Sequence, residues 1–167
     1  MKKYLITGCS GFVGKHFIDY LERNKIPADI LGIDINCPIN NKSRYKIIKY
    51  EFRKVNLLNK EEVRKIIQKF CPDYLLHLAS YSSVAFSWDN PILSFQNNTN
   101  IFLNLVDVMR ELKINCRILS VGSSEEYGDI PSHKMPITED APLCPISVYA
   151  VARVAQENLS RVFVNGF

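Results

Sequence analysis

A tyrosine and an arginine lie four positions apart near the start of the last predicted helix, at Tyr149 and Arg153. Residues at this spacing project from the same face of a helix. A tyrosine hydroxyl, with an ordinary pKa of about 10, exchanges protons near neutral pH only when a nearby cation lowers that value. Arg153 supplies such a cation, although the spacing taken alone favours an ordinary surface pair.

Hydroxyl and carboxyl side chains also follow a predicted strand, in the run VGSSEEYG from Val121 to Gly128. In an open parallel sheet, ligands bind outside the carboxyl ends of the strands. A serine there can hydrogen-bond a substrate oxygen, and a glutamate can move a proton on carbon. The alternative is a polar loop with a helix cap. Together with Tyr149, the run favours the functional interpretation.

Glycines recur every third position at Gly8, Gly11 and Gly14, between a predicted strand and a predicted helix. Glycine permits a tight turn and lets a pyrophosphate approach the main chain, and the helix N-terminus offers free N–H groups. Asp34 ends the next strand 20 residues after Gly14, where a carboxylate meets the adenosine ribose. The combination predicts dinucleotide binding rather than a simple turn.

The type of dinucleotide follows from charge. The Asp34 carboxylate would repel the 2′-phosphate of NADP, which favours NAD as the cofactor. The basic residues Lys42 and Arg44 nearby keep NADP open as an alternative.

Apolar periodicity places these residues on alternating strands and helices. Strands are expected at 2–7, 29–34, 47–52, 74–78 and 117–121, and helices at 12–24, 60–70, 92–112 and 147–164. This alternation predicts an α/β fold with a doubly wound parallel sheet, Rossmann-like, in one domain over residues 1–167. Because no strand follows the last helix, we expect a chain truncated before a C-terminal substrate domain.

Composition excludes several classes of protein. The chain of 167 residues is 47% apolar with a scattered net charge of +4, which argues against disorder and against a nucleic-acid surface. It contains neither a run of about 20 apolar residues nor a signal-peptide core, so we expect a cytoplasmic protein that does not cross a membrane. Five scattered cysteines and three histidines predict no disulfide framework and no metal site.

In this order along the chain, the motifs resemble the extended short-chain dehydrogenase/reductases, the NAD-dependent epimerase/dehydratase family that modifies nucleotide sugars. The resemblance covers nearly the whole chain. It rests on TGCSGFVG at 7–14, Asp34, HLAS at 77–80, Asn98, SSEEYG at 123–128, and Tyr149 with its partner four residues on. The segments 116–128, 82–84 and 87–88 look most like the branch of GDP-mannose 4,6-dehydratase and GDP-4-keto-6-deoxymannose reductase.

The resemblance implies roles for individual residues. Tyr149 would be the acid/base at the sugar C4 hydroxyl with Arg153 beside it, Ser123 its hydrogen-bonding helper, and Glu125 the group that moves protons for elimination across C5 and C6. Substrate contacts would come from Ser82, Ser83, Val84 and Ser124. Cofactor contacts would come from Gly8, Ser10, Gly11, Phe12, Val13, Gly14, Asp34, Ile35, Asn36, Asn56, Leu57, Leu78, Ala79, Ser80, Asn98, Tyr149 and Arg153.

Two positions depart from the family pattern, which has lysine in place of Arg153 and more often Asp-Leu in place of Asn56-Leu57. Arginine stays charged and, unlike lysine, cannot relay protons. The favoured hypothesis is an NAD-dependent 4,6-dehydratase of a GDP-linked hexose or heptose. The alternatives are a 4-keto reductase, an epimerase, or a cofactor-binding module without turnover. The resemblance also implies a homodimer through the helices at 92–112 and 147–164.

Overall fold

The computed structural model describes residues 1–38 and 45–166. Lys42 and Arg44, on which the NADP alternative rests, lie outside the described residues. Five strands form one parallel sheet in the order β3-β2-β1-β4-β5. The strands are β1 (Lys2–Thr7), β2 (Ala28–Asp34), β3 (Lys49–Lys54), β4 (Tyr74–His77) and β5 (Arg117–Ser120). The predicted α/β fold with a doubly wound, Rossmann-like sheet is confirmed.

Contacts divide the chain into two compact units. The first contains residues 1–79 and 104–121, which include the whole sheet. The second contains residues 80–103 and the chain from residue 122 onward. The prediction of one domain over 1–167 stays a prediction.

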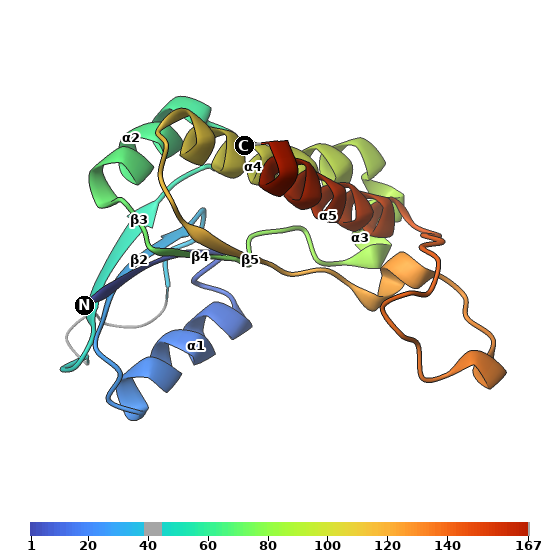
Figure 1. The fold of residues 1–167 in the computed structure, drawn as a ribbon, viewed down its shortest axis with the longest axis horizontal. Helices are drawn as coiled ribbons and strands as arrows, with labels where there is room; N and C mark the ends of the chain where they lie inside the picture. The colour runs from blue at the N-terminus through green and yellow to red at the C-terminus, as the bar shows by residue number, and fades with distance from the viewer. Residues whose placement is uncertain (39–44, 167) are drawn as a thin grey trace. The chain divides into compact units, whose positions relative to one another are not determined.

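Within the first unit, α1 (Phe12–Arg23) lies on one face of the sheet and α2 (Lys60–Phe70) on the other (Figure 1). The amphipathic pattern of α2 buries Val63 and Ile67 on its inner side. The Asn59 side chain caps this helix by accepting a hydrogen bond from the Glu62 N–H group.

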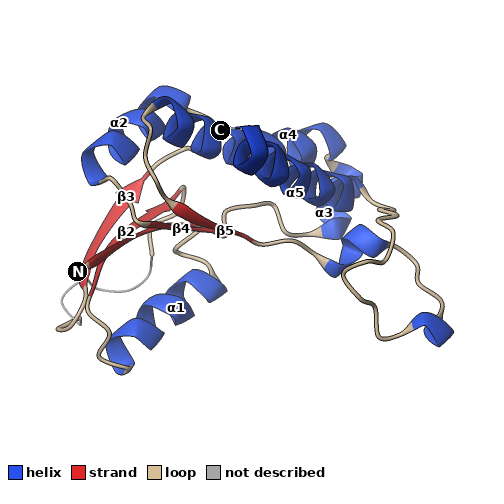
Figure 2. Ribbon diagram, in the orientation of Figure 1, coloured by secondary structure: helices blue, strands red, loops and turns tan. Residues whose placement is uncertain are grey.

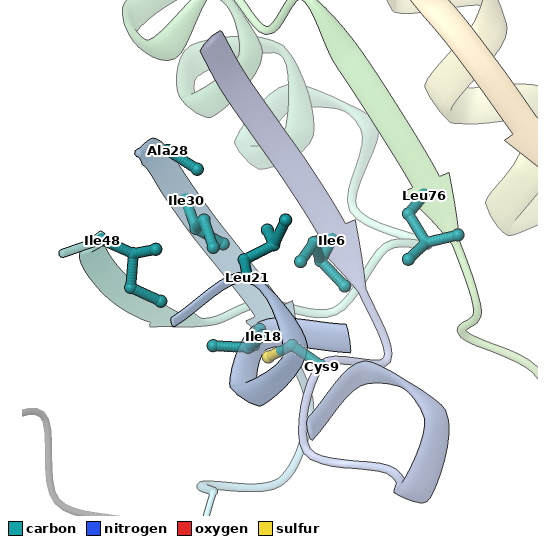
Figure 3. Close-up of a cluster of buried hydrophobic side chains, with 8 residues drawn as sticks. All are labelled: Ile6, Cys9, Ile18, Leu21, Ala28, Ile30, Ile48 and Leu76. Atoms are coloured by element: carbon teal, nitrogen blue, oxygen red, sulfur yellow. The ribbon is translucent and has the colours of Figure 1, made fainter. Parts of the chain in front are cut away.

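The core between α1 and the sheet is built from residues that alternate along the strands and recur every three or four positions along the helix. Figure 3 shows its members pointing toward one another from β1, β2, β4, α1 and the adjoining segments. They are Ile6, Cys9, Ile18, Leu21, Ala28, Ile30, Ile48 and Leu76. This packing fixes where the first helix begins relative to the ends of β1 and β2.

The second unit is mainly helical, as the colouring by secondary structure makes clear (Figure 2). It contains α3 (Val84–Asp89), the first part of α4 (Pro91–Glu111), two short 3-10 helices, η2 (Ser124–Tyr127) and η3 (Ser132–Lys134), and α5 (Val148–Gly166). Both α3 and η2 contact α5. Among the described residues, no helix has the length and apolar character needed to span a membrane.

Two strand expectations were wrong in detail. β3 starts at Lys49 rather than residue 47, because Ile48 is buried in the core without pairing in the sheet. The strand expected at 117–121 ends one residue earlier, at Ser120, and its apolar residues are not all buried, since β5 ends the strand order of the described sheet and Leu119 is 60% exposed.

Candidate functional site

The glycine-rich turn joins β1 to α1 at the carboxyl end of the sheet. Gly8 has φ +68°, and a Cβ atom there would lie 2.8 Å from the Ala79 main-chain nitrogen. A Cβ atom on Gly14 would lie 2.8 Å from the Cα atom of Cys9. Both positions therefore require glycine, one for its conformation and both for the close approach of two backbone segments.

The N-terminus of α1 is open to a ligand. Gly11 precedes the helix with φ −73° and ψ 173°, and no side chain caps it. The first N–H groups of a helix have no partner within the helix, and they attract anions. The Phe12 and Val13 side chains are 79% and 55% exposed, so their predicted contribution to cofactor binding would come from these main-chain groups.

Asp34 organises the end of β2. Its carboxylate accepts one hydrogen bond from the Ser10 N–H group at 3.0 Å and another from the Asn36 N–H group at 3.0 Å. The Ser10 hydroxyl donates to the Asn36 carbonyl oxygen at 2.7 Å. Asp34 thus ties the glycine-rich turn to the segment after β2, where Ile35 is 50% exposed.

The ends of β1 and β4 meet at Thr7. The Thr7 hydroxyl oxygen accepts hydrogen bonds from the N–H groups of Leu78 at 3.2 Å and Ala79 at 3.3 Å. It also lies 2.8 Å from Nδ1 of His77, which is 1% exposed. His77 therefore has the core position that its strand predicts. The strand order reverses between β1 and β4, and such a reversal is where open α/β sheets bind dinucleotides.

Asn56 and Leu57 lie in the turn after β3. The Asn56 side-chain oxygen accepts a hydrogen bond from the Leu58 N–H group at 3.0 Å. The Leu57 side chain is buried, and its carbonyl oxygen accepts a hydrogen bond from Asn104 at 2.9 Å. These hydrogen bonds stabilise the turn. The predicted contacts of Asn56 and Leu57 with a cofactor stay predictions.

A cavity of about 120 Å³ adjoins the glycine-rich turn, with Cys9, Ser10, Lys15, Tyr45 and Tyr50 in its lining. Ligand sites usually measure about 300–1,000 Å³, so this cavity is too small for a dinucleotide. Burial raises the pKa of the Cys9 thiol to about 11, so the thiol stays protonated at neutral pH. The cavity therefore offers no reactive cysteine.

Tyr149 and Arg153 lie together on α5 in the second unit. The Ser147 hydroxyl oxygen accepts a hydrogen bond from the Ala150 N–H group at 3.1 Å and so caps the helix just before Tyr149. Tyr149 is 8% exposed and Arg153 is 5% exposed. The guanidinium carbon lies 5.2 Å from the centre of the tyrosine ring, within cation–π distance. The interpretation as an ordinary surface pair is therefore wrong.

The side chains of Ser80 and Gln156 bind the Arg153 guanidinium group. Its Nη2 atom donates to the Ser80 hydroxyl at 2.6 Å, and its Nη1 atom donates to Oε1 of Gln156 at 3.0 Å. Gln156 is 1% exposed. Ser80 was predicted as a cofactor contact, and in the structure its hydroxyl accepts a hydrogen bond from Arg153.

The predicted catalytic run forms the short helix η2, which contacts α5. The Ser123 hydroxyl accepts a hydrogen bond from the Glu125 N–H group at 3.3 Å, and Oε1 of Glu126 accepts one from the Ser123 N–H group at 2.7 Å. This reciprocal arrangement is a capping box. Glu125 is half-buried and Ser124 is exposed. The helix cap considered as the alternative is present, and it holds Ser123 in place.

Glu126 was not predicted as a site residue, although its spacing from Ser123 is the sequence signal of a capping box. Burial is the main cause that raises the pKa of its carboxyl group, and a hydrogen bond with Glu157 of α5 raises it further. The Ser123 N–H group and the charge of Arg153 act in the opposite direction. The buried carboxyl group of Glu126 therefore lies near Arg153 and bonds the half-exposed Glu157.

The other predicted contacts of this unit have structural partners. Ser83 caps α3, since its hydroxyl accepts a hydrogen bond from the Phe86 N–H group at 3.1 Å. Ser82 is exposed and Val84 is the first residue of α3. The Asn98 side chain bonds the main chain of Tyr81 twice, accepting from its N–H group at 2.7 Å and donating to its carbonyl oxygen at 3.0 Å.

The structure brings the predicted residues together in two groups. In the first unit, Gly8 and Gly14 pack closely against the main chain of Ala79 and Cys9, and the Asp34 carboxylate bonds Ser10 of the same turn. In the second unit, Tyr149 and Arg153 lie on the helix that η2 contacts.

Comparison with known proteins agrees with this geometry. The model of a family described as GDP-mannose 4,6 dehydratase matches residues 5–166. CDP-paratose 2-epimerase of Salmonella typhi is 31% identical over 152 residues, which cover 85% of this chain and 43% of that protein. The dTDP-glucose 4,6-dehydratase of Neisseria meningitidis serogroup B is 25% identical over an alignment of 178 residues, which covers 100% of this chain and 50% of that protein.

Among solved structures, the UDP-glucose 4-epimerase of Thermus thermophilus in complex with NAD is similar, with a TM-score of 0.84 and 26% sequence identity. The match covers 99% of this chain and 51% of that one. The chain therefore spans about half the length of the relatives that it matches.

Proposed function

Because the chain belongs to the NAD-dependent epimerase/dehydratase family of extended short-chain dehydrogenase/reductases, we propose that the whole protein is a nucleotide-sugar 4,6-dehydratase that uses NAD. The observation that carries the proposal is the buried pair of Tyr149 and Arg153 on a helix that contacts the serine- and glutamate-bearing η2. A base for a hydroxyl group and a carboxylate for a C–H bond are the two groups that oxidation followed by elimination requires.

The cofactor would bind in the first unit. The open N-terminus of α1 would receive the pyrophosphate, and Asp34 would accept hydrogen bonds from the adenosine ribose. When bound, NAD supplies oxidation at the sugar C4 and returns the same hydride at C6. The Asp34 carboxylate favours NAD over NADP, since it would face a 2′-phosphate.

The residues of the second unit would move protons. Tyr149, held beside the Arg153 cation, would take the proton of the C4 hydroxyl group while Ser123 donates a hydrogen bond to the same oxygen. Glu125 would then remove the C5 proton, which the neighbouring C4 ketone makes acidic, and the C6 hydroxyl group would leave as water. Return of a proton to C5 completes a 4-keto-6-deoxy sugar without net consumption of NAD.

The nucleotide and sugar form the finer part of the proposal. We infer a GDP-linked hexose or heptose, on the resemblance of segments 116–128 and 82–84 to the GDP-mannose branch and on the description of the matching family model. The test is turnover of the whole protein with GDP-, UDP-, dTDP- and CDP-linked hexoses. Exclusive turnover of a UDP-, dTDP- or CDP-linked sugar would overturn this assignment.

An epimerase is the second candidate, because two of the relatives described above are named as epimerases. Reaction in deuterium oxide separates the candidates. A 4,6-dehydratase gives a 6-deoxy-4-keto product carrying deuterium at C5, a 4-epimerase gives a C4 epimer without deuterium at C5, and a 4-keto reductase consumes NAD(P)H one for one. The proposal predicts the first result and is overturned by either of the other two.

A binding module without turnover is the competing hypothesis, and Arg153 is its basis. Arginine supplies a permanent charge but relays no proton. We expect the whole protein to turn over with Arg153 in place, because Tyr149 and Ser123 carry the proton transfer. Turnover that appears only in the Arg153→Lys variant would favour the module.

We also propose that two copies associate through α4 and α5. Both helices carry apolar side chains on their exposed surface, among them Ile92 at 72% exposure and Val151 at 43%. Burial of such side chains against a second copy would remove them from water.

A further inference from the structure

The Arg153 guanidinium group is held at two separate nitrogen atoms by side chains from different segments. Ser80, just after β4 in the chain, accepts from Nη2 at 2.6 Å, and Gln156, one turn further along α5, accepts from Nη1 at 3.0 Å. All three residues belong to the second unit. The guanidinium group is planar and its donors are fixed in a fork, so two acceptors on different nitrogens determine the orientation of its plane.

That orientation places the positive charge at the Tyr149 ring, 5.2 Å from its centre. Arg153 and Gln156 are almost completely buried, at 5% and 1% exposure. In such an environment a hydrogen bond is stronger than in water, and an unpaired polar group is costly. The hydrogen bond from Arg153 to the Gln156 amide therefore has a large effect on the orientation of the Arg153 guanidinium group.

Several charged groups surround the pair formed by Arg153 and the amide of Gln156. Glu126 of η2 interacts with the Arg153 charge and shares a hydrogen bond with Glu157 of α5, and Arg161 forms an ion pair with Glu157 at 2.5 Å. Glu125 lies next to Glu126 on η2. Another carboxylate at position 156 would add a negative charge beside Arg153, whereas the neutral amide accepts the Nη1 hydrogen bond without adding one.

We propose that Gln156, together with Ser80, is a positioning residue that fixes the Arg153 guanidinium group against the ring of Tyr149. Ser80 restrains the group at Nη2 and Gln156 restrains it at Nη1. Arg153 in turn stabilises the Tyr149 tyrosinate that forms during proton transfer. This role rests on the proposed catalytic function of Tyr149. The positioning itself is a property of the chain and is measurable without turnover.

The first experiment measures rotation of the Arg153 guanidinium group by NMR on the chain labelled with 15N-arginine. Arg153→Lys assigns the signals. A group bound at both nitrogens gives resolved Nη–H signals, whereas a freely rotating group gives one averaged signal. We expect Gln156→Met, which keeps the volume and removes the acceptor, to lose the resolved Nη1 signals, and Gln156→Glu, which keeps the acceptor, to retain them.

Two further variants make this experiment decisive. Ser160→Ala removes a hydroxyl that donates to the Gln156 carbonyl at 2.9 Å and leaves the amide side chain intact, so its Arg153 signals should match those of the wild type. Ser80→Ala removes the other acceptor at a half-buried position and should release Nη2, which tests the same arrangement if Gln156→Met does not fold. Resolved Nη signals in both Gln156→Met and Ser80→Ala would overturn the positioning role.

The second experiment tests the consequence for chemistry in the whole protein. We expect Gln156→Met to lower kcat about tenfold and to change KM less than about twofold, because a misplaced group costs rate in the transition state, by up to about 100-fold per ångström. Released NMR signals with an unchanged kcat would overturn the link between Gln156 and catalysis. If the wild type transforms no nucleotide sugar, the proposed function fails, and the NMR experiment still decides the positioning role.

Discussion

At the scale of single residues, Asp34 has a structural role, and we propose that it also binds the cofactor. Its carboxylate accepts hydrogen bonds from two main-chain N–H groups, and in the proposed complex it would also accept hydrogen bonds from the adenosine ribose. Hydrogen bonds to a charged group contribute about 1.5–3 kcal/mol, so we expect Asp34→Ala to weaken NAD binding by tenfold or more. Isothermal titration calorimetry of the chain with NAD measures the change.

Asp29→Asn is the matched control for that prediction. Asp29 lies at the other end of β2 and pairs with Lys49 across 3.8 Å, with the Lys49 side chain largely exposed. The control should bind NAD as the wild type does. Equal losses in Asp34→Ala and Asp29→Asn would show that the strand, rather than the Asp34 carboxylate, determines affinity.

Glu126 predicts a pH dependence of stability. Burial and the bond with Glu157 raise the pKa of this carboxyl group above its ordinary value of 4.5. A raised pKa means that the folded state binds the proton more tightly than the unfolded state. The contribution to stability is fully present below about pH 4.5 and is lost as the pH rises through the folded-state value.

Glu126→Gln tests this sign. Glutamine keeps the oxygen that accepts the Ser123 N–H group and carries no charge, so it resembles the protonated acid. We expect the variant to have a higher melting temperature than the wild type at pH 7 and a smaller advantage at pH 4. Thermal unfolding followed by circular dichroism across this range measures the difference. An advantage that grows as the pH falls would contradict the assignment.

At the scale of elements, Asn98 connects α4 to the segment that follows β4. Its amide satisfies both the N–H group and the carbonyl oxygen of Tyr81 while itself 1% exposed. Asn98→Ala leaves both main-chain groups without these partners, and we expect a loss of about 2 kcal/mol in the free energy of unfolding. Urea denaturation measures it, with Asn100→Ala, exposed on the same helix, as the control. Equal stability of the two variants would contradict this role.

Periodicity was sufficient to predict most elements of this chain. The expected helix at 60–70 coincides with α2, and the expected strand at 2–7 coincides with β1, because both patterns are regular and end at strong turn signals. The helix α3 was not predicted, because six residues are too few to display an apolar period. β3 began later than expected because apolar character reports burial, and Ile48 is buried without pairing.

The candidate site was predictable only where residue type and spacing carry the chemistry. The glycine spacing and the separation of Tyr149 from Arg153 are local patterns, and both describe neighbours in the structure. The bonds from Arg153 to Ser80 and Gln156 were not predictable, because a serine 73 positions away leaves no periodic trace and a buried glutamine looks like a polar surface residue. Tertiary packing creates the bond to Ser80, whereas Gln156 lies three positions from Arg153 on the same helix and only its burial was hidden from the sequence.

At the scale of the whole molecule, the predicted residues divide between the two compact units. The cofactor residues from Gly8 to Ala79 lie in the first unit, and Tyr149, Arg153 and Ser123 lie in the second. The chain passes from one unit to the other after Ala79, within α4 and after Val121. The boundary between the two units therefore falls inside the sequence motif at 77–80, between Ala79 and Ser80, and the motif itself does not predict it.

Association of two copies is the prediction that belongs to this scale. A stable interface buries about 800 Å² on each partner, and its centre is usually apolar. Ile92 and Val151 are exposed apolar residues of α4 and α5 in the second unit. We expect light scattering after size-exclusion chromatography to give twice the chain mass of 19.2 kDa for the wild type and the single mass for the double variant Ile92→Glu/Val151→Glu, because a buried carboxylate without a partner opposes association.

Tyr20→Glu, on the exposed side of α1, is the control and should leave the mass unchanged. A wild-type chain that elutes at 19.2 kDa at micromolar concentration, or a double variant that keeps the doubled mass, would contradict an interface on these two helices.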